Sequence, residues 1–304
     1  MIPEKFKIPI AYAIICLLWG STWLAIKVGV EELSPAFSAG IRFLIAAVLI
    51  YLIAKYRRLK ISYDVESMKL YLILAFFSFS IPFGLVYWAE QFVPSGLASI
   101  LFGIFPFFVI IFSTIIIPDQ KPNVMQVIGA VLGFAGIFVI FSEQLIINLD
   151  LDLYFWGMIA IAFSAAMQGW VAVHIKKHSL KINPLTMNFL PLLIAGTVMT
   201  LIGLIFEWDY DWNFSGKAIS SVAYLAVFGT IGTFTTYYWL MKRINVVLLS
   251  LSSFITPIVA VLLGFFILDE VLTSRDFLGS VFVLIGILLA NLKGLLKYLK
   301  EKRK

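Results

Sequence analysis

Charged residues and cysteine are scarce in this chain of 304 residues. Only 13% of the residues are charged, against about 25% in a soluble globular protein. The one cysteine, Cys16, excludes a disulfide within the chain, a cysteine zinc site and a CxxC redox pair. The sequence has two histidines, His174 and His178, and no GxxxxGK[ST] motif, so no catalytic triad, metal set or nucleotide loop is indicated. We therefore expect neither an enzyme nor a cofactor.

Apolar residues, in contrast, are abundant. They make up 62% of the sequence, with 28 Phe, 12 Tyr and 8 Trp, and the mean hydropathy is +1.00. The cores of a soluble protein of this size could not bury so much apolar surface. A helix that crosses a membrane needs about 20 apolar residues, so ten such helices would use about two-thirds of the chain. The composition indicates an all-α polytopic membrane protein.

Ten apolar runs are separated by clusters of charge, Pro and Gly. The first run follows Lys5 and Lys7 as in a signal peptide, but no A-x-A-like cleavage site follows it, and we expect an uncleaved first helix. We predict transmembrane helices at 9–30, 35–54, 69–89, 94–117, 123–141, 153–174, 184–206, 218–241, 246–268 and 275–292.

The few cations give these helices an orientation. If the N-terminus is cytoplasmic, the 23 Lys and Arg residues all lie at cytoplasmic ends except Lys27, Arg42, Lys217 and Arg275. Most Asp and Glu residues lie at the opposite ends, so both termini are predicted to be cytoplasmic. The net charge of +6 and the basic tail at 293–304 then indicate contact with the membrane surface, and no nucleic acid partner is expected.

The two halves of the chain resemble each other. The stretch 87–106 matches the stretch 238–257 at an offset of 151, so that Pro106 meets Pro257. Each half holds five predicted helices, and because five is odd, the second copy enters the membrane inverted relative to the first. Inverted repeats are typical of transporters, with the binding site near the membrane midplane where the halves meet. The predicted repeats cover 8–141 and 153–292.

Two sets of motifs lie near the beginning and the end of these repeats. The first half carries Leu18-Trp19-Gly20-Ser21-Thr22-Trp23, then Lys27, Ser34-Pro35, Arg42-Phe43-Leu44 and Val93-Pro94-Ser95-Gly96. The second half carries Thr256-Pro257, Gly264, Leu268-Asp269-Glu270, Gly279 and Gly286. Together they resemble the EamA domain of the drug/metabolite transporter superfamily over residues 8–292. One departure is Gln120, where many members carry Glu.

The resemblance implies a ten-helix carrier in the cytoplasmic (inner) membrane of a prokaryote, without a cofactor or an ATPase module. Such carriers are often exporters of amino acids, their metabolites or drug-like compounds. It also implies a central cavity lined by helices 1, 3, 4, 6, 8 and 9, with the fifth and tenth helices outside it. The partners would be a small-molecule substrate and the lipid bilayer, and the carrier would be a monomer or a homodimer.

Three residues of the first helix stand four apart and share one face: Trp19, Trp23 and Lys27. They would suit an aromatic cavity wall with a cation near the outer mouth, where a carboxylate or an aromatic ring could bind. The alternative is that the aromatic rings only fill helix packing and that Lys27 reaches the outer interface.

Arg42 and Gln168 are polar side chains deep in predicted helices. Arg42 lies seven residues past Pro35, about 10 Å into helix 2, where a charge faces the bundle, a partner or water. It could attract an anionic substrate group or bond the carbonyls of a neighbouring helix. The family resemblance implies an Arg here whatever the substrate, which favours the structural role. Gln168 could bond a partner helix or the substrate.

Aromatic residues close helices 3 and 8. Tyr87 and Trp88 precede Glu90 at the outer face, and Tyr238 and Trp239 occupy the matching positions at the inner face. Such residues commonly form interface belts. The alternative is that they contact substrate or gate the cavity.

Other candidates follow from the repeat. Pro106 and Pro257 fall in the middle of helices 4 and 9, where each would kink the helix near Ser99 and Ser250. These kinks could be hinges around a cavity or fixed packing features.

Trp170 and His174 share a face near the inner end of helix 6. No Asp or Glu lies deep in a helix, so any coupling or gating is expected at end groups such as Lys27, Glu90 and His174. The spacing of Gly129, Gly133 and Gly136 predicts close helix packing within the monomer.

These observations predict a secondary transporter that exports amino acids or related small metabolites by alternating access. The many aromatic residues favour apolar or aromatic substrates. Export of drug-like or lipid compounds is the alternative within transport. A non-transporting membrane scaffold or sensor is the alternative outside it.

Overall fold

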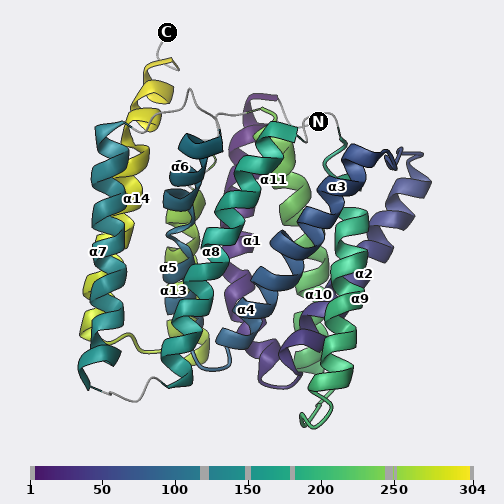
Figure 1. Cartoon of the computed structure of the whole chain (residues 1–304), viewed down its shortest axis with the longest axis horizontal. Helices are drawn as coiled ribbons and strands as arrows, with labels where there is room; N and C mark the ends of the chain where they lie inside the picture. Colours follow the sequence, from purple (N-terminus) through teal and green to yellow (C-terminus); the bar gives the residue numbers. More distant parts are fainter. Residues whose placement is uncertain are drawn as a thin grey trace.

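The computed structural model describes residues 4–116, 123–147, 152–178, 182–243, 249 and 252–301, and all regular structure in these ranges is helical (Figure 1). Each predicted run holds a helix in its described part. In chain order the elements are α1 (Glu4–Val30), α2 (Pro35–Tyr56), α3 (Val65–Ile73), η1 (Leu74–Ser80), α4 (Ile81–Ala89), α5 (Ser95–Phe102), α6 (Phe105–Ile116), α7 (Val124–Ile147), α8 (Leu153–His178), η2 (Thr186–Asn188), α9 (Phe189–Phe206), α10 (Gly216–Ala226), η3 (Val227–Gly232), α11 (Thr233–Met241), α13 (Ser252–Leu268) and α14 (Ser274–Glu301).

Several of these helices have the length and composition of membrane spans. Among the described residues there are seven such stretches, and two shorter apolar helices, Val124–Ile140 and Ile255–Leu268, accompany them. Large apolar side chains on the outside of the bundle are exposed, such as Phe138 at 69% and Phe266 at 74%. A surface of this kind suits lipid rather than water. The chain therefore has the architecture of a polytopic membrane protein.

Two pairs of helices form the edges of the bundle, and the other helices form its centre. In Figure 1, α7 and α14 lie side by side at one edge and α2 and α9 lie together at the other. Between them, α1 packs against α5, α10, α11 and α13, and α8 packs against α4 and α6. The start of α1 and the end of α14 lie at the same side of the bundle. The centre is thus built from elements of both halves of the sequence.

Small residues let α7 approach α14 closely. A Cβ added at Gly136 would lie 2.5 Å from the Gly279 carbonyl oxygen, and one added at Gly286 would lie 2.5 Å from the Gly129 carbonyl oxygen. A Cβ added at Gly133 would meet the ring of Phe107, and the Gly133 backbone nitrogen would lie 2.7 Å from a Cβ added at Gly286. The predicted close packing of this glycine run within the monomer is confirmed.

The fourth predicted helix is not a single kinked helix. It divides into α5 and α6, with Gly103 and Ile104 between them, so Pro106 lies in the first turn of α6 rather than in the middle of a helix. The physical reason is that the proline ring clashes with the carbonyl four residues earlier, which is that of Phe102, the last residue of α5. The first turn of a helix tolerates the missing N–H. Pro257, in contrast, lies inside α13 as predicted.

Two stretches predicted as uninterrupted helix contain a π-helical segment. The segment η1 joins α3 to α4, and η3 joins α10 to α11. In each, a hydroxyl side chain donates to the carbonyl five residues earlier: Ser80 to Ala75 (2.8 Å) and Thr230 to Leu225 (2.8 Å). The wider turn of a π-helix leaves carbonyl groups without an α-helical partner, and such bulges are frequent at functional sites.

Carboxylates cap helices across the fold. Glu270, after α13, accepts hydrogen bonds from the backbone amides of Ser95 (2.7 Å) and Gly96 (3.0 Å) at the beginning of α5. Glu207, after α9, accepts from the amide of Ala36 (3.0 Å) at the beginning of α2. Helix N-termini carry unpaired N–H groups and a partial positive charge, so both contacts tie a loop of one half to a helix of the other.

Two ionisable loop residues, Asp64 and Tyr210, hydrogen-bond to the ends of helices. Asp64 caps α3 by accepting from the Ser67 amide (3.0 Å) and hydroxyl (2.7 Å), and these hydrogen bonds lower the pKa of the Asp64 carboxyl. The Tyr210 hydroxyl donates to the Val30 carbonyl at the end of α1 (2.6 Å), and burial raises the pKa of that phenol.

Candidate substrate cavity

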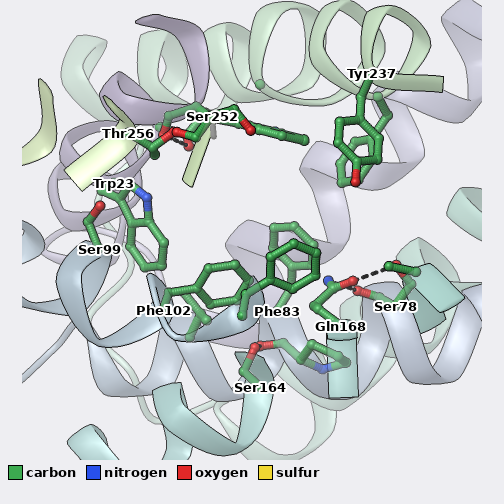
Figure 2. A pocket seen from close by; sticks show the side chains of 18 of the residues that line it. Trp23, Ser78, Phe83, Ser99, Phe102, Ser164, Gln168, Tyr237, Ser252 and Thr256 are labelled. Atoms are coloured by element: carbon green, nitrogen blue, oxygen red, sulfur yellow. Dashed lines mark hydrogen bonds between the residues drawn. The ribbon is translucent and has the colours of Figure 1, made fainter. Parts of the chain in front are cut away.

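A cavity of about 150 Å³ lies among the central helices. This volume is many times the roughly 10–15 Å³ that one water molecule requires, so it can take a small organic molecule. Side chains from both halves of the chain line it, as Figure 2 shows, and α7 and α14 contribute none of the described lining residues. Its walls come from α1, α2, η1, α4, α5, α6, α8, η3, α11 and α13.

Aromatic rings form much of this wall. Trp19 lies with its ring centroid 6.1 Å from that of Phe234, and Trp23 lies 5.5 Å from Phe102. Phe83 lies 6.4 Å from Phe234 on the opposite helix. In Figure 2, Trp23, Phe102 and Phe83 border the open space on its left and lower sides. Trp19 and Trp23, which were predicted to share one face of the first helix, both line this cavity.

Arg42 brings a charge to the cavity wall. Its side chain is 1% exposed and donates from Nε to the Thr230 hydroxyl (2.8 Å), from Nη1 to the Tyr87 hydroxyl (2.9 Å) and from Nη2 to the Gly229 carbonyl (3.1 Å). The guanidinium carbon lies 5.2 Å from the centre of the Phe83 ring. Arg42 therefore joins α2 to α4 and η3 and also lines the cavity.

Gln168 supplies the amide of the wall. Its Nε2 donates to the Ser78 carbonyl in η1 (2.8 Å), and the Ser78 hydroxyl donates back to Oε1 (3.0 Å), as the dashed lines in Figure 2 mark. Ser164, one turn earlier on α8, donates to the Pro82 carbonyl (3.0 Å). Gln168 thus bonds a neighbouring helix, which was one of its two expected roles, and it also borders the cavity.

Ser99 and Tyr238 also line the cavity. The Ser99 hydroxyl is buried and has no hydrogen-bond partner among the described residues. Pro257 borders the cavity, whereas Pro106 does not. Ser250 lies outside the described residues.

Lys27 and Glu90 meet beside the cavity without lining it. The Lys27 ammonium donates to the backbone carbonyls of Glu90 (2.6 Å) and Gln91 (3.4 Å), at the C-terminal end of α4 where a cation is favoured. The Glu90 side chain is fully buried, and neither carboxylate oxygen has a hydrogen-bond partner among the described residues. Lys27 therefore binds helix-end carbonyls instead of extending toward a substrate.

Four aromatic residues expected at the cavity lie away from its lining. Tyr87 is behind Arg42, whose Nη1 donates to the Tyr87 hydroxyl. Trp88 packs on Phe92, with ring centroids 5.5 Å apart. The ring of Trp239 lies under the Arg243 guanidinium, 4.0 Å from its central carbon to the ring centre. Trp170 stacks on His174, with ring centroids 5.4 Å apart.

The helical turn explains these misplacements. Trp239 follows Tyr238 by one residue and Tyr237 by two, about 100° and 200° around the helix, so it points away from the face of α11 that Tyr237 and Tyr238 share. Trp170 is two residues past Gln168, about 200° around α8. His174, four residues past Trp170, shares its outward face.

Several lining residues were not predicted from the sequence, chiefly Phe83, Phe102, Phe234, Ser78 and Thr256. A usable signal exists for one pair. Phe83 and Phe234 are 151 residues apart, which is the offset of the predicted repeat. Each lies on the same helix face as a tyrosine four residues later, Tyr87 or Tyr238, and these two tyrosines are also 151 residues apart.

Comparison with known sequences decides the family. The EamA-like transporter family matches residues 7–142 and again residues 155–292. The chain belongs to this family. Protein PagO of Salmonella typhimurium is 30% identical over 94% of this chain and 93% of its own length. The uncharacterized transporter YoaV of Bacillus subtilis is 28% identical over 92% and 95%.

Other relatives agree with this assignment. The uncharacterized inner membrane transporter YedA of Escherichia coli is 27% identical over 91% of this chain and 88% of its own length. A crystal structure of a protein with 18% identity has the same fold, with a TM-score of 0.66 over 94% of this chain and 96% of that one. YoaV and YedA are named as transporters, and none of these three relatives is named as an enzyme. This EamA-like protein is a multi-pass membrane transporter.

Proposed function

We propose that this EamA-like chain is a carrier of the bacterial inner membrane that exports amino acids or related small metabolites by alternating access. Ten helices would cross the membrane as two inverted repeats, 8–141 and 153–292, with both termini and the tail at 293–304 in the cytoplasm. Two observations support this arrangement. The family matches each half separately, and the start of α1 and the end of α14 lie on the same side of the bundle.

One observation carries the proposal: the cavity lies where the two halves meet and takes its walls from both. Rigid-body movement of one half against the other would then change access to the cavity while the site itself persists. The aromatic wall with a few hydroxyl and amide groups suits a small amphipathic molecule.

The two ends of the cavity differ. Its lining extends to Met241, the last residue of α11, on the side predicted to be cytoplasmic. On the other side it stops at Ile26 and Val86, next to the place where Lys27 binds the end of α4. A carrier that faces inward would have a cavity that extends in this direction. Lys27 with Glu90, and Glu270 with Ser95, would form the outer closure.

Counterflow in proteoliposomes tests the function. Vesicles with the purified chain are loaded with one unlabelled amino acid and diluted into the same amino acid in labelled form, for a panel that covers aromatic, aliphatic, polar and charged side chains. Transient accumulation of label, strongest with an aromatic or large apolar member, is expected. If no member accumulates, the amino-acid substrate is wrong, and drug-like compounds and lipids become the substrates to test.

Matched tryptophan variants test the site. Trp19→Ala and Trp23→Ala remove the aromatic wall and should weaken the affinity for the exchanged amino acid. Trp208→Ala is the control, because the Trp208 side chain is 77% exposed and remote from the cavity lining. Equal affinity in all three variants would remove the aromatic wall from the binding site.

A further inference from the structure

We propose that the cavity binds its substrate through an anionic group, and that Arg42 is the residue that pairs with this group. The substrate class is then an organic anion with an apolar body, for which a carboxylate is the fitting head group. This inference rests on the proposed function, because it assumes that the transported molecule enters this cavity.

The charge of the cavity wall is the first argument. Arg42 is a lining residue, and no Asp or Glu is found among the described lining residues. Its three hydrogen-bond acceptors, on Thr230, Tyr87 and Gly229, are all neutral. The Glu90 carboxyl, one turn past Tyr87, makes no hydrogen bond to Arg42 or to any other described residue. A buried cation without a carboxylate partner is costly, and a bound anion offsets that cost.

The hydrogen-bond count is the second argument. A guanidinium carries five N–H groups. The three bonds of Arg42 use one N–H each on Nε, Nη1 and Nη2, which leaves one on Nη1 and one on Nη2. One N–H from each Nη atom is the set that a carboxylate engages in a bidentate pair. The existing bonds hold the guanidinium in place, so little further side-chain entropy is lost when an anion binds.

The neighbours of the guanidinium are the third argument. The ring centres of Phe83 and Phe43 lie 5.2 Å and 5.4 Å from its central carbon. Such apolar surroundings lower the local dielectric and strengthen an ion pair. Phe83 also lines the cavity, so an apolar substrate body would rest on aromatic rings next to the charge.

A positive wall in which no described lining residue is an acid also predicts which molecules bind poorly. The amino group of a zwitterion finds only neutral acceptors there, such as the carbonyl oxygen of Gln168 and the unpartnered hydroxyl of Ser99. The carboxylate therefore contributes more to binding than the ammonium. A neutral amide of the same shape binds more weakly than the carboxylate, and an amine without a carboxylate is repelled by Arg42.

Isothermal titration of the purified full chain in a neutral detergent tests this with matched ligands. The pairs are 3-phenylpropionate against 3-phenylpropanamide, and indole-3-acetate against indole-3-acetamide. In at least one pair the carboxylate should bind about tenfold more tightly than the amide, as charge-assisted hydrogen bonds predict. Equal affinities in both pairs, or no binding of either carboxylate, would overturn the proposal.

Variants assign the effect to Arg42. Arg42→Gln should bring the carboxylate-to-amide affinity ratio to about one, and Arg42→Lys, which keeps the charge but loses the fork, should give an intermediate ratio. Arg57→Gln is the control, since Arg57 is an exposed residue just after α2. If Arg42→Gln does not fold, the ligand pairs on the unmodified chain still decide the matter. A ratio unchanged in a folded Arg42→Gln protein would overturn the proposal.

Two further measurements distinguish this proposal from lipid binding and from a failure of the carrier proposal. An anionic lipid offers the same head-group chemistry, and weaker carboxylate binding in phosphatidylglycerol nanodiscs than in phosphatidylcholine nanodiscs would identify a lipid as the anion. Binding can be measured without transport, so the two proposals can fail separately. Carboxylate binding without counterflow would support the anion site and contradict the carrier. Counterflow with equal competition by carboxylates and amides would support the carrier and contradict the anion site.

Discussion

Ser78 and Gly229 stand 151 residues apart, and each offers a backbone carbonyl of a π-helical segment to a polar side chain from another helix. Ser78 receives the amide of Gln168, and Gly229 receives the guanidinium of Arg42. The two halves of the chain thus use the same backbone irregularity at matching positions to hold the two deeply placed polar side chains of the cavity.

The π-helical segments explain why these polar side chains are tolerated in a membrane protein. An amide or a guanidinium in an apolar interior must find acceptors. A regular α-helix has no spare carbonyls in its middle, because each already accepts from the N–H four residues later. A π-helical turn disturbs this pattern and makes a carbonyl available. The π-helical segments therefore account for where Arg42 and Gln168 are held in the cavity wall and for how their polar groups are satisfied.

Loss of the Gln168 amide should destabilise this wall. Gln168→Ala leaves the Ser78 carbonyl and hydroxyl without their partner, so the free energy of unfolding is expected to fall by about 1–3 kcal/mol. Ser164→Ala, which removes a single bond to the Pro82 carbonyl, should cost less, about 1 kcal/mol. Denaturation in mixed micelles, followed by circular dichroism, compares the two. Equal losses would contradict the special role of the Gln168 pair.

The glycine contact between α7 and α14 should not tolerate a side chain. Gly136→Val places atoms against the Gly279 carbonyl oxygen, 2.5 Å from the first added carbon, and against the Val283 amide nitrogen at 2.8 Å. We expect a loss of about 1–3 kcal/mol in the free energy of unfolding from this overpacking. Gly216→Ala is the control, because nothing lies within 4 Å of an added Cβ there. Thermal unfolding with the same midpoint for Gly136→Val and the unmodified chain would show that the helices do not approach so closely.

The cap of α3 gives a pH-dependent prediction. The folded-state pKa of Asp64 is depressed below its usual value of about 3.9, so its stabilising effect is present above that value and is lost as the pH falls through the folded-state pKa. Asp64→Asn keeps a capping side chain that does not ionise in this way. The unmodified chain should have the higher thermal midpoint at pH 7, and the difference should shrink toward pH 3. A difference that is constant over this range would contradict an ionised cap.

Much of the helical layout could be predicted from hydrophobic runs, because each run of about 20 apolar residues leaves few other structures open to the chain. Four-residue spacing also placed Trp19 and Trp23 on one face, and the depth of Arg42 and Gln168 marked them as residues that need partners. Trp88, Trp170 and Trp239 were misplaced because a single residue turns the helix by about 100°, and composition alone does not fix which side faces the centre.

The backbone irregularities could not be foreseen in the same way. The break before Pro106 depends on whether the chain bends or stops at the clash with the Phe102 carbonyl, and both are physically open to a proline. The π-helical segments carry only a weak mark in the sequence, the hydroxyls of Ser80 and Thr230, which are common residues in membrane helices. The carboxylate cap on α5 joins residues 175 apart, and no local pattern links Glu270 to Ser95.

The most direct test of alternating access is counterflow by a chain whose outer closure can be locked. In a Cys16→Ser background, Ser95→Cys and Glu270→Cys are combined, because the two side chains meet between the halves at 3.0 Å. A short bis-methanethiosulfonate, which joins the two thiols through disulfide bonds, is added, and accumulation of the exchanged amino acid is measured before and after it. Cross-linking should abolish exchange, a reductant that cleaves the disulfides should restore it, and neither single-cysteine variant should respond. Undiminished exchange by the fully cross-linked chain would contradict alternating access between the two halves.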